Sequence, residues 1–196
     1  MMSQTVRSFI AIELPAAVLS LLDSVQQELK GLRLKARWVR PQNIHLTLKF
    51  LGNIDSGEIE KIGRAMVDAT VDSAPFTLTI GGIGFFPDIK RPRVIWVGLD
   101  GAKPALFNLQ RNLADRLAIA GFPKEERSFK AHLTLGRIRQ AVNPNIVDQA
   151  IQGYSDLGDL KFTVNRIILF KSDLKPSGAE YSHLKQMDVR KMNIEY

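Results

Sequence analysis

A tetrapeptide that occurs twice constrains this chain more than any other feature of its sequence. His45-Leu-Thr-Leu48 recurs as His132-Leu-Thr-Leu135, at an offset of 87 residues, and these segments hold two of the chain's three histidines. From ordinary residue usage, the probability of this coincidence is on the order of one in a million. A repeat that covers most of the chain indicates two structural units of the same kind.

The segments around the two tetrapeptides repeat at nearly the same offset. The repeat predicts strands over 8–12 and 95–99, helices over 18–29 and 106–120, helices over roughly 56–71 and 144–152, and strands over 76–80 and 162–170. The first of the shorter helices begins at Asp55-Ser-Gly-Glu58, which has the spacing of a capping box. Gly81 and Gly82, with Gly84 close behind, indicate a bend or bulge rather than a domain boundary.

These patterns predict an α+β fold of two similar lobes related by a pseudo-twofold axis. We expect each lobe to be an antiparallel-rich sheet with helices on its outer face, and the active-site cleft to lie between the lobes. The whole chain, 1–196, would form a single bilobal domain, with repeats at about 6–90 and 93–177 and a closing strand at about 180–188.

Composition narrows the class of protein and of partner. The chain has 196 residues, 45% of them hydrophobic, which excludes a disordered chain, and its net charge of +7 favours an anionic partner. It has no cysteine, so disulfides, thiolate catalysis and cysteine-based zinc sites are impossible. Glu13 and Pro15 interrupt the apolar N-terminal run, which argues against a signal peptide and favours a cytoplasmic location.

The repeated motif places an imidazole beside a hydroxyl. Side chains alternate between the two faces of a strand, so His45, Thr47 and Lys49 would share one face, opposite Leu46, Leu48 and Phe50. His132 and Thr134 would likewise share a face, opposite buried leucines. A buried structural pair is the plain alternative, but the leucines alone would satisfy the core. The identical polar pairs in otherwise diverged halves therefore indicate chemistry.

A metal site would need three or four ligands, and no carboxylate lies at ligand spacing from either histidine. Two imidazoles can instead act as one general base and one general acid, each contributing about 10²–10⁴ in rate. Threonine hydroxyls and nearby cations suit the nonbridging oxygens of a phosphodiester. The residues thus favour metal-independent acid–base chemistry on a phosphodiester, without settling which histidine takes which part.

The paired His-x-Thr-Leu motifs, together with the segments 7–15, 38–52, 84–87, 93–98 and 129–137, resemble the 2H phosphoesterase superfamily. Within it the chain is similar to the RNA 2′,3′-cyclic phosphodiesterases, also called the 2′-5′ RNA ligase family. The resemblance implies hydrolysis of an RNA terminal 2′,3′-cyclic phosphate to a 2′-phosphomonoester, with no metal and no cofactor, and possible reverse 2′-5′ ligation. Small cyclic nucleotides as substrates, or a noncatalytic nucleotide- or RNA-binding module, are the alternatives.

The resemblance also implies roles for single residues. His45 would be the proton donor and His132 the proton acceptor, while Thr47, Thr134 and Arg137 would bind the phosphate. Arg137 lies five residues after His132, so strict alternation puts it on the leucine face unless the strand bends near Gly136. If it does not bend, Lys49 is the alternative cation. We expect a monomer that binds RNA or a small cyclic nucleotide and no membrane.

Other polar and aromatic residues have weaker claims. His183 lacks the following threonine and is predicted to be an exposed strand residue. Phe9, Trp96 and Phe50 are predicted to be core residues. Phe85, Phe86 and Phe129 are candidates to stack on a terminal base, although packing is favoured. Some basic residues near the motif ends would line the RNA approach; they are Arg91, Arg93, Arg127, Lys130, Arg139 and Lys171.

Overall fold

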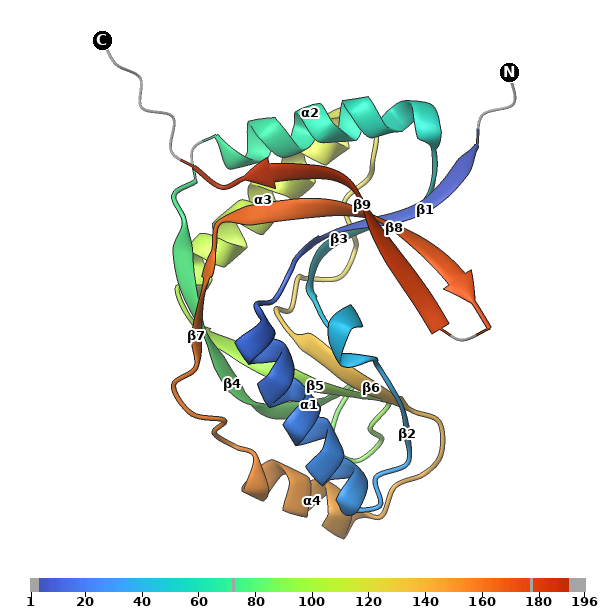
Figure 1. Cartoon of the computed structure of the whole chain (residues 1–196), viewed down its shortest axis with the longest axis vertical. Coiled ribbons are helices and arrows are strands. Elements are labelled where there is room, and N and C mark those ends of the chain that lie inside the picture. The colour runs from blue at the N-terminus through green and yellow to red at the C-terminus, as the bar shows by residue number, and fades with distance from the viewer. Residues whose placement is uncertain (1–3, 72, 177, 191–196) are drawn as a thin grey trace.

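A computed structural model of the chain, which describes residues 4–71, 73–176 and 178–190, shows strands and helices in alternation (Figure 1). The ends of the predicted domain, 1–3 and 191–196, lie outside the described residues. The first half contains β1 (Thr5–Ile12), α1 (Ala16–Gly31), β2 (Ala36–Trp38), β3 (Leu46–Asp55), α2 (Ile59–Thr70) and β4 (Phe76–Phe86). The second half contains β5 (Val94–Gly101), α3 (Lys103–Ile119), β6 (Leu133–Ile138), α4 (Pro144–Gly153), β7 (Lys161–Val164), β8 (Arg166–Lys175) and β9 (Gly178–Asp188).

The strands form two antiparallel sheets, as the α+β prediction requires. One sheet has the order β3-β1-β8-β9, and the other has the order β2-β6-β5-β4-β7. The strands that follow the two motif histidines, β3 and β6, therefore belong to different sheets. This arrangement confirms the predicted fold of two similar units.

The two sheets do not coincide with the two halves of the sequence, because the halves exchange strands. Strand β4 of the first half pairs with β5 of the second, and β8 of the second half pairs with β1 of the first. The single strand predicted over 162–170 is wrong for this reason: it divides at Asn165 into β7, which pairs with β4, and β8 in the other sheet. An apolar run looks continuous in sequence even where the chain crosses between sheets.

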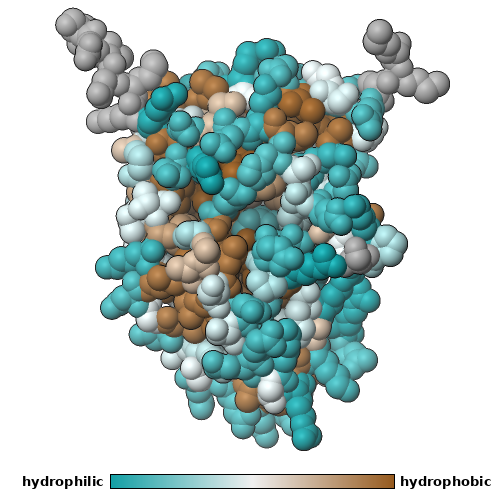
Figure 2. All heavy atoms as spheres, in the orientation of Figure 1, coloured by the Kyte–Doolittle hydropathy of each residue, from teal (hydrophilic) through white to brown (hydrophobic). Residues whose placement is uncertain are grey.

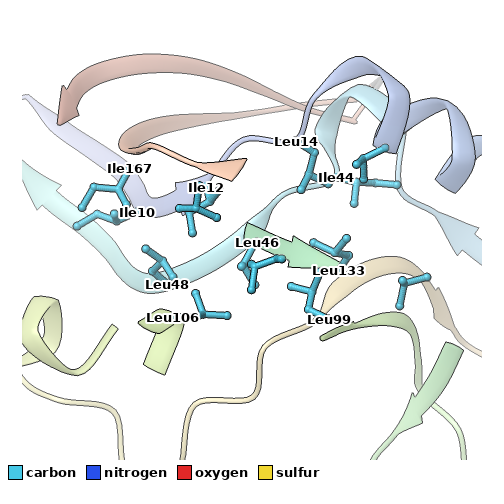
Figure 3. Packing of buried hydrophobic residues seen from close by; sticks show 14 of the residues in the cluster. Ile10, Ile12, Leu14, Ile44, Leu46, Leu48, Leu99, Leu106, Leu133 and Ile167 are labelled. Carbon is cyan, nitrogen blue, oxygen red and sulfur yellow. The ribbon is translucent and has the colours of Figure 1, made fainter. Parts of the chain in front are cut away.

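A single hydrophobic core lies beneath both motif strands. Leu46 and Leu48 of β3 and Leu133 and Leu135 of β6 are all buried in it. Figure 3 shows three of these leucines beside Leu106 of α3. The helical stripes predicted from periodicity also belong to this core. Their buried residues are Val18, Leu22, Val25 and Leu29 in α1 and Leu106, Leu109, Leu113 and Leu117 in α3. The predicted separation of leucines from the polar pair is therefore correct.

Local signals in the sequence correspond to local features of the structure. Asp55 accepts a hydrogen bond from the Gly57 amide at 2.8 Å, and Glu58 accepts one from the Asp55 amide at 3.2 Å. This capping box closes a short 3-10 turn over Ser56–Glu58, directly before α2. The pairing of β4 with β5 shifts register between Ile80 and Ile83, which confirms the bulge predicted at the two glycines.

Candidate active site

Each motif strand carries a β-bulge at the same position of the repeat. In the β1–β3 pair, Thr47 lies opposite Ala11 and the next paired residue is Lys49, so Leu48 has no partner. In the β5–β6 pair, Thr134 lies opposite Trp96 and the next paired residue is Gly136, so Leu135 has no partner. One extra residue reverses the alternation of side chains beyond it.

The bulge in β6 decides the position of Arg137. Because Leu135 is unpaired, Arg137 follows Thr134 on the same face of the sheet, opposite Val94 of β5. Its positive charge is one of the influences on the pKa of His132 and on that of Tyr181. The bend near Gly136 that Arg137 needs in order to share a face with Thr134 is therefore present.

The bulge in β3 corrects two predictions about its neighbours. Lys49, opposite Ile10, leaves the face of His45, and its buried ammonium donates to the Pro123 carbonyl at 2.6 Å. Phe50, opposite Phe9, joins that face instead and is 61% exposed rather than part of the core. Strict alternation, which holds only for a regular strand, made both predictions wrong.

Glutamines from the helices hold the bulges. Gln26 of α1 is buried and donates to the Val39 and Leu135 carbonyls, both at 2.8 Å. Gln110 of α3 donates to the Leu48 carbonyl at 3.3 Å. In each case the bulged leucine is supported by a helix from the other half of the sequence, so the exchange between halves extends to the helices.

Both motif imidazoles are held in the same way. The Nδ1 atom of His45 lies 2.8 Å from the Asn43 carbonyl oxygen, and Nδ1 of His132 lies 2.6 Å from the Lys130 carbonyl oxygen. A carbonyl oxygen only accepts, so each Nδ1 carries a proton and donates it. The Nε2 atom of each neutral ring is thus left as the basic atom, which fixes both the tautomer and the orientation of each ring.

His45 stands in an aromatic environment. Its ring stacks on Phe9, with centroids 4.6 Å apart, and meets Tyr181 of β9 edge-on at 5.4 Å. Burial lowers the pKa of His45 to about 4, against the opposing effect of the hydrogen bond to Asn43. Burial also raises the pKa of Tyr181, so its hydroxyl stays protonated at neutral pH. Neither Phe9 nor Tyr181 was predicted as a site residue, because apolar strand positions carry no signal of which sheet face they occupy.

His132 lies in a less enclosed position. Its ring meets Phe86 edge-on at 5.0 Å, and Phe86 in turn stacks on Trp96. Burial lowers the pKa of His132, the hydrogen bond to Lys130 opposes this, and the nearby charge of Arg137 lowers the pKa further. Both motif histidines are therefore neutral at pH 7 in the unliganded protein.

One cavity joins the two motifs. It has a volume of about 750 Å³ and is lined by both Thr47 and His132. Aromatic side chains and cations complete its wall; they include Phe50, Phe86, Phe129, Arg93, Arg127 and Lys130. A second hollow, of about 290 Å³, is lined by Arg137 and by Tyr181, the neighbour of His45. Thr134 is half-buried in β6 and faces Trp96.

The remaining candidates lie elsewhere. His183 is exposed, as predicted, and its Nε2 lies 2.6 Å from Oε1 of Glu13. Phe85 is buried in the core, whereas Phe86 and Phe129 line the cavity. Among the described residues, no three histidine, aspartate or glutamate side chains gather as metal ligands would. None of the described helices is both long and apolar enough to cross a bilayer.

Fold and site together define a two-motif architecture, in which two repeated His-x-Thr strands, one in each sheet, bring Thr47 and His132 to the wall of one cavity. The sequence profile of the LigT-like phosphoesterase family matches the chain twice, over residues 12–96 and 97–181. The chain belongs to this family.

Named relatives and solved structures agree with this membership. A protein of Methanothermobacter thermautotrophicus, named RNA 2′,3′-cyclic phosphodiesterase, is 30% identical over 92% of this chain and 97% of its own length. One of Aquifex aeolicus with the same name is 29% identical over 93% and 97%. The crystal structure of TT0787 of Thermus thermophilus superposes with a TM-score of 0.77, at 26% identity over 95% of this chain and 99% of that one. Escherichia coli LigT complexed with NADP⁺ gives 0.76, at 25% identity over 96% and 100%.

Proposed function

We propose that this protein hydrolyses the 2′,3′-cyclic phosphate at the end of an RNA to a 2′-phosphomonoester, without a metal, by two-histidine acid–base catalysis. The observation that carries the proposal is the matched pair of imidazoles, each with Nδ1 held by a carbonyl two residues before it. The names of relatives at about 30% identity supply the substrate class.

The proposed reaction displaces the 3′ oxygen of the terminal ribose from phosphorus. Nε2 of His132 accepts a proton from water as the water oxygen bonds to phosphorus. Nε2 of His45 donates its proton to the departing 3′ oxygen, and the bond from phosphorus to the 2′ oxygen stays intact. Thr47, Thr134 and Arg137 hold the nonbridging oxygens, where negative charge develops.

The negative charge of the substrate favours the protonated state of His45 that the proposed steps need. His45 must be protonated before it donates, yet burial holds its pKa at about 4 in the unliganded protein. A phosphodiester anion beside the ring favours the imidazolium and raises that pKa. The proposed roles therefore require that binding of the cyclic phosphate raises the pKa of His45 enough to charge its ring, while His132 stays neutral and able to accept.

The cavity next to His132 suits the terminal nucleoside. Its volume of about 750 Å³ lies within the range typical of ligand sites. Phe50, Phe86 and Phe129 offer aromatic surface on which a base can stack in a sequence-tolerant way. The complex of Escherichia coli LigT with NADP⁺ supports a nucleotide as the kind of ligand that this fold binds.

Incubation with 2′,3′-cyclic CMP, and with a short RNA that ends in a cyclic phosphate, tests the proposal in the presence of EDTA. We expect turnover that EDTA leaves unchanged, and phosphorus NMR of the product should show a 2′-phosphate. His45→Ala and His132→Ala should each lower the rate at least about a hundredfold. Loss of activity with EDTA would refute the metal-free mechanism, and binding without turnover would identify a noncatalytic module. Joining of RNA ends by the same groups is measured by adding a 5′-hydroxyl RNA.

A further inference from the structure

A chain of cations leads away from the candidate active site along the edge of the five-stranded sheet. The hollow that holds Arg137 and Tyr181 is also lined by Arg37, Arg40 and Arg139. A further hollow, of about 690 Å³, adjoins it, since both are lined by Arg37, Trp38 and Arg139. We call these two adjoining hollows the basic groove; its cations are Lys30, Arg33, Lys35, Arg37, Arg40 and Arg139.

Three elements that are distant in sequence build the basic groove. Lys30 comes from the last turn of α1, Arg37 and Trp38 come from β2, and Arg139 follows the end of β6. Figure 1 shows the end of α1 and strand β2 side by side at the lower end of the molecule. Figure 2 shows that mostly hydrophilic residues cover this end.

Apart from Arg40, the cations of the basic groove have no carboxylate partner among the described residues. No aspartate or glutamate is among the described residues that line its two hollows. Within the described chain, no carboxylate lies within 4.0 Å of the cationic groups of Lys30, Arg33, Lys35, Arg37 or Arg139, whereas cations such as Lys103 and Lys185 have such partners. Long cationic side chains kept together without counter-charges repel one another, and a polyanion relieves that repulsion.

Trp38 adds an aromatic surface in the middle of this path. It lines both hollows, and the Lys30 ammonium lies 5.7 Å from the centre of its ring. A Cβ at Gly136 would lie 3.2 Å from Trp38, so the glycine lets the indole pack closely on β6. A positively charged groove with an aromatic platform is the arrangement by which proteins follow a single-stranded nucleic acid without reading its sequence.

Together with the proposed function, on which this inference rests, these features identify a partner. We infer that the basic groove binds the phosphates of the nucleotides that precede the cyclic end, so that single-stranded RNA runs from Arg137 and Tyr181 past Trp38 towards Lys30 and Arg33. A small cyclic nucleotide reaches only the candidate active site and gains nothing from the groove. The preferred substrate is therefore an oligonucleotide end rather than a free cyclic nucleotide.

The opposite exit from the candidate active site is less suited to an RNA chain. The cavity beside His132 contains cations too, but Glu125 lies in its wall. That cavity is also where we place the terminal nucleoside. The uninterrupted run of positive charge lies on the side of Arg137.

Chain-length dependence of turnover tests the inference. The substrates are 2′,3′-cyclic CMP and RNAs of two, three, four and six nucleotides that end in a cyclic phosphate. The groove variant is Arg33→Gln/Lys35→Gln/Arg139→Gln, and the control is Arg64→Gln/Arg111→Gln/Lys161→Gln, which removes three exposed cations elsewhere. We expect kcat/KM to rise with length in the wild type and in the control. The groove variant should lose at least about tenfold on the hexamer while it hydrolyses cyclic CMP at the wild-type rate.

Salt dependence of binding supplies a readout that needs no turnover. Fluorescence anisotropy with a 3′-phosphorylated RNA hexamer gives log Kd against log salt concentration, and each lost phosphate contact on a single strand lowers the slope by about 0.7. The groove variant should therefore lose about 2 in slope and the control none.

The outcomes separate this inference from the proposed function. Absence of turnover on every cyclic phosphate would refute the proposed function, and the salt slopes would still decide the groove. Turnover with equal slopes and equal length dependence in both triple variants would overturn the groove alone. A loss of length dependence in Arg93→Gln/Arg127→Gln instead would show that RNA leaves through the other cavity, which also overturns it.

Discussion

The buried side chain of Gln26 is the most direct test of how the fold positions Arg137. We consider Gln26→Met, which keeps the length of the side chain and removes its amide. The wild-type amide donates to the Val39 and Leu135 carbonyls at 2.8 Å each, from a residue that is only 1% exposed. A neutral hydrogen bond contributes about 0.5–1.5 kcal/mol, so we expect the free energy of unfolding to fall by about 2 kcal/mol.

The comparison needs two further variants. Gln27→Met changes the next residue of the same helix, an exposed side chain that donates only to Asp23 at 3.2 Å, and should stay within about 0.5 kcal/mol of the wild type. Gln110→Met removes the single 3.3 Å bond to the Leu48 carbonyl and should cost about 1 kcal/mol. Urea unfolding followed by circular dichroism gives all three differences, provided that the dependence on urea is unchanged.

The effect on activity distinguishes positioning from stability. A loosened bulge at Leu135 lets Arg137 drift from the face of Thr134, so kcat/KM should fall by about tenfold in Gln26→Met. That is the effect of about 1.5 kcal/mol, the lower end of the 1.5–3 kcal/mol that a hydrogen bond to a charged group contributes. Gln27→Met should retain wild-type kcat/KM. The reasoning fails if Gln26→Met unfolds at the same urea concentration as the wild type, or if it loses stability with no change in activity.

Three further predictions concern the motif imidazoles and the packing against Trp96. Because both motif imidazoles have lowered pKa values in the free enzyme, the acid limb of the pH profile of kcat/KM should lie below pH 6.5. The acid limb of kcat, which reports the complex with the anionic substrate, should lie at higher pH. Acid limbs at the same pH would contradict this prediction. Because burial lowers the pKa of His45 from 6.5 to about 4, the unfolded protein binds a proton at this residue between these pH values and the folded protein does not. Lowering the pH from 7.5 to 4 should therefore reduce the free energy of unfolding by about 3 kcal/mol more in the wild type than in His45→Gln. The control Thr47→Val keeps the imidazole and should lose as much stability as the wild type over this pH range. If urea unfolding shows the same pH dependence for the wild type and His45→Gln, the lowered pKa of His45 is refuted. Gly84→Ala would place a Cβ 2.2 Å from the Trp96 ring, so its unfolding free energy should fall by about 1–3 kcal/mol, whereas an unchanged urea midpoint would contradict this packing.

The parts of the site that local patterns determine could be predicted from sequence. The leucines beneath the two His-x-Thr pairs and the main apolar positions of the helical stripes follow from periodicity, and they are buried as expected. Of the polar pairs themselves, Thr47 and His132 line the cavity. The position of Arg137 could only be stated as a condition, because a period of two residues contains no information about where a strand is bulged. Phe50 and Lys49 were misassigned for the same reason.

Features that depend on pairing between strands distant in sequence could not be predicted from the sequence. Tyr181 reaches His45 only because β9 joins the sheet of β1 through β8. The predicted strand over 162–170 likewise divides at Asn165 because its two parts join different sheets. An apolar sequence does not indicate which sheet a strand joins. The roles assigned to the site residues, the monomeric state, the cytoplasmic location and the extent of the domain stay predictions.

The exchange of strands between the halves has a consequence for how the molecule is made. A ribosome releases the chain from its N-terminus, at about 5–20 residues per second. Strand β1 leaves first, yet one of its two neighbours, β8, ends at Lys175. The sheet that contains β1 and β3 therefore stays open along one edge until synthesis has passed Lys175, and any premature stop before β8 would release a nascent chain with that edge exposed to aggregation.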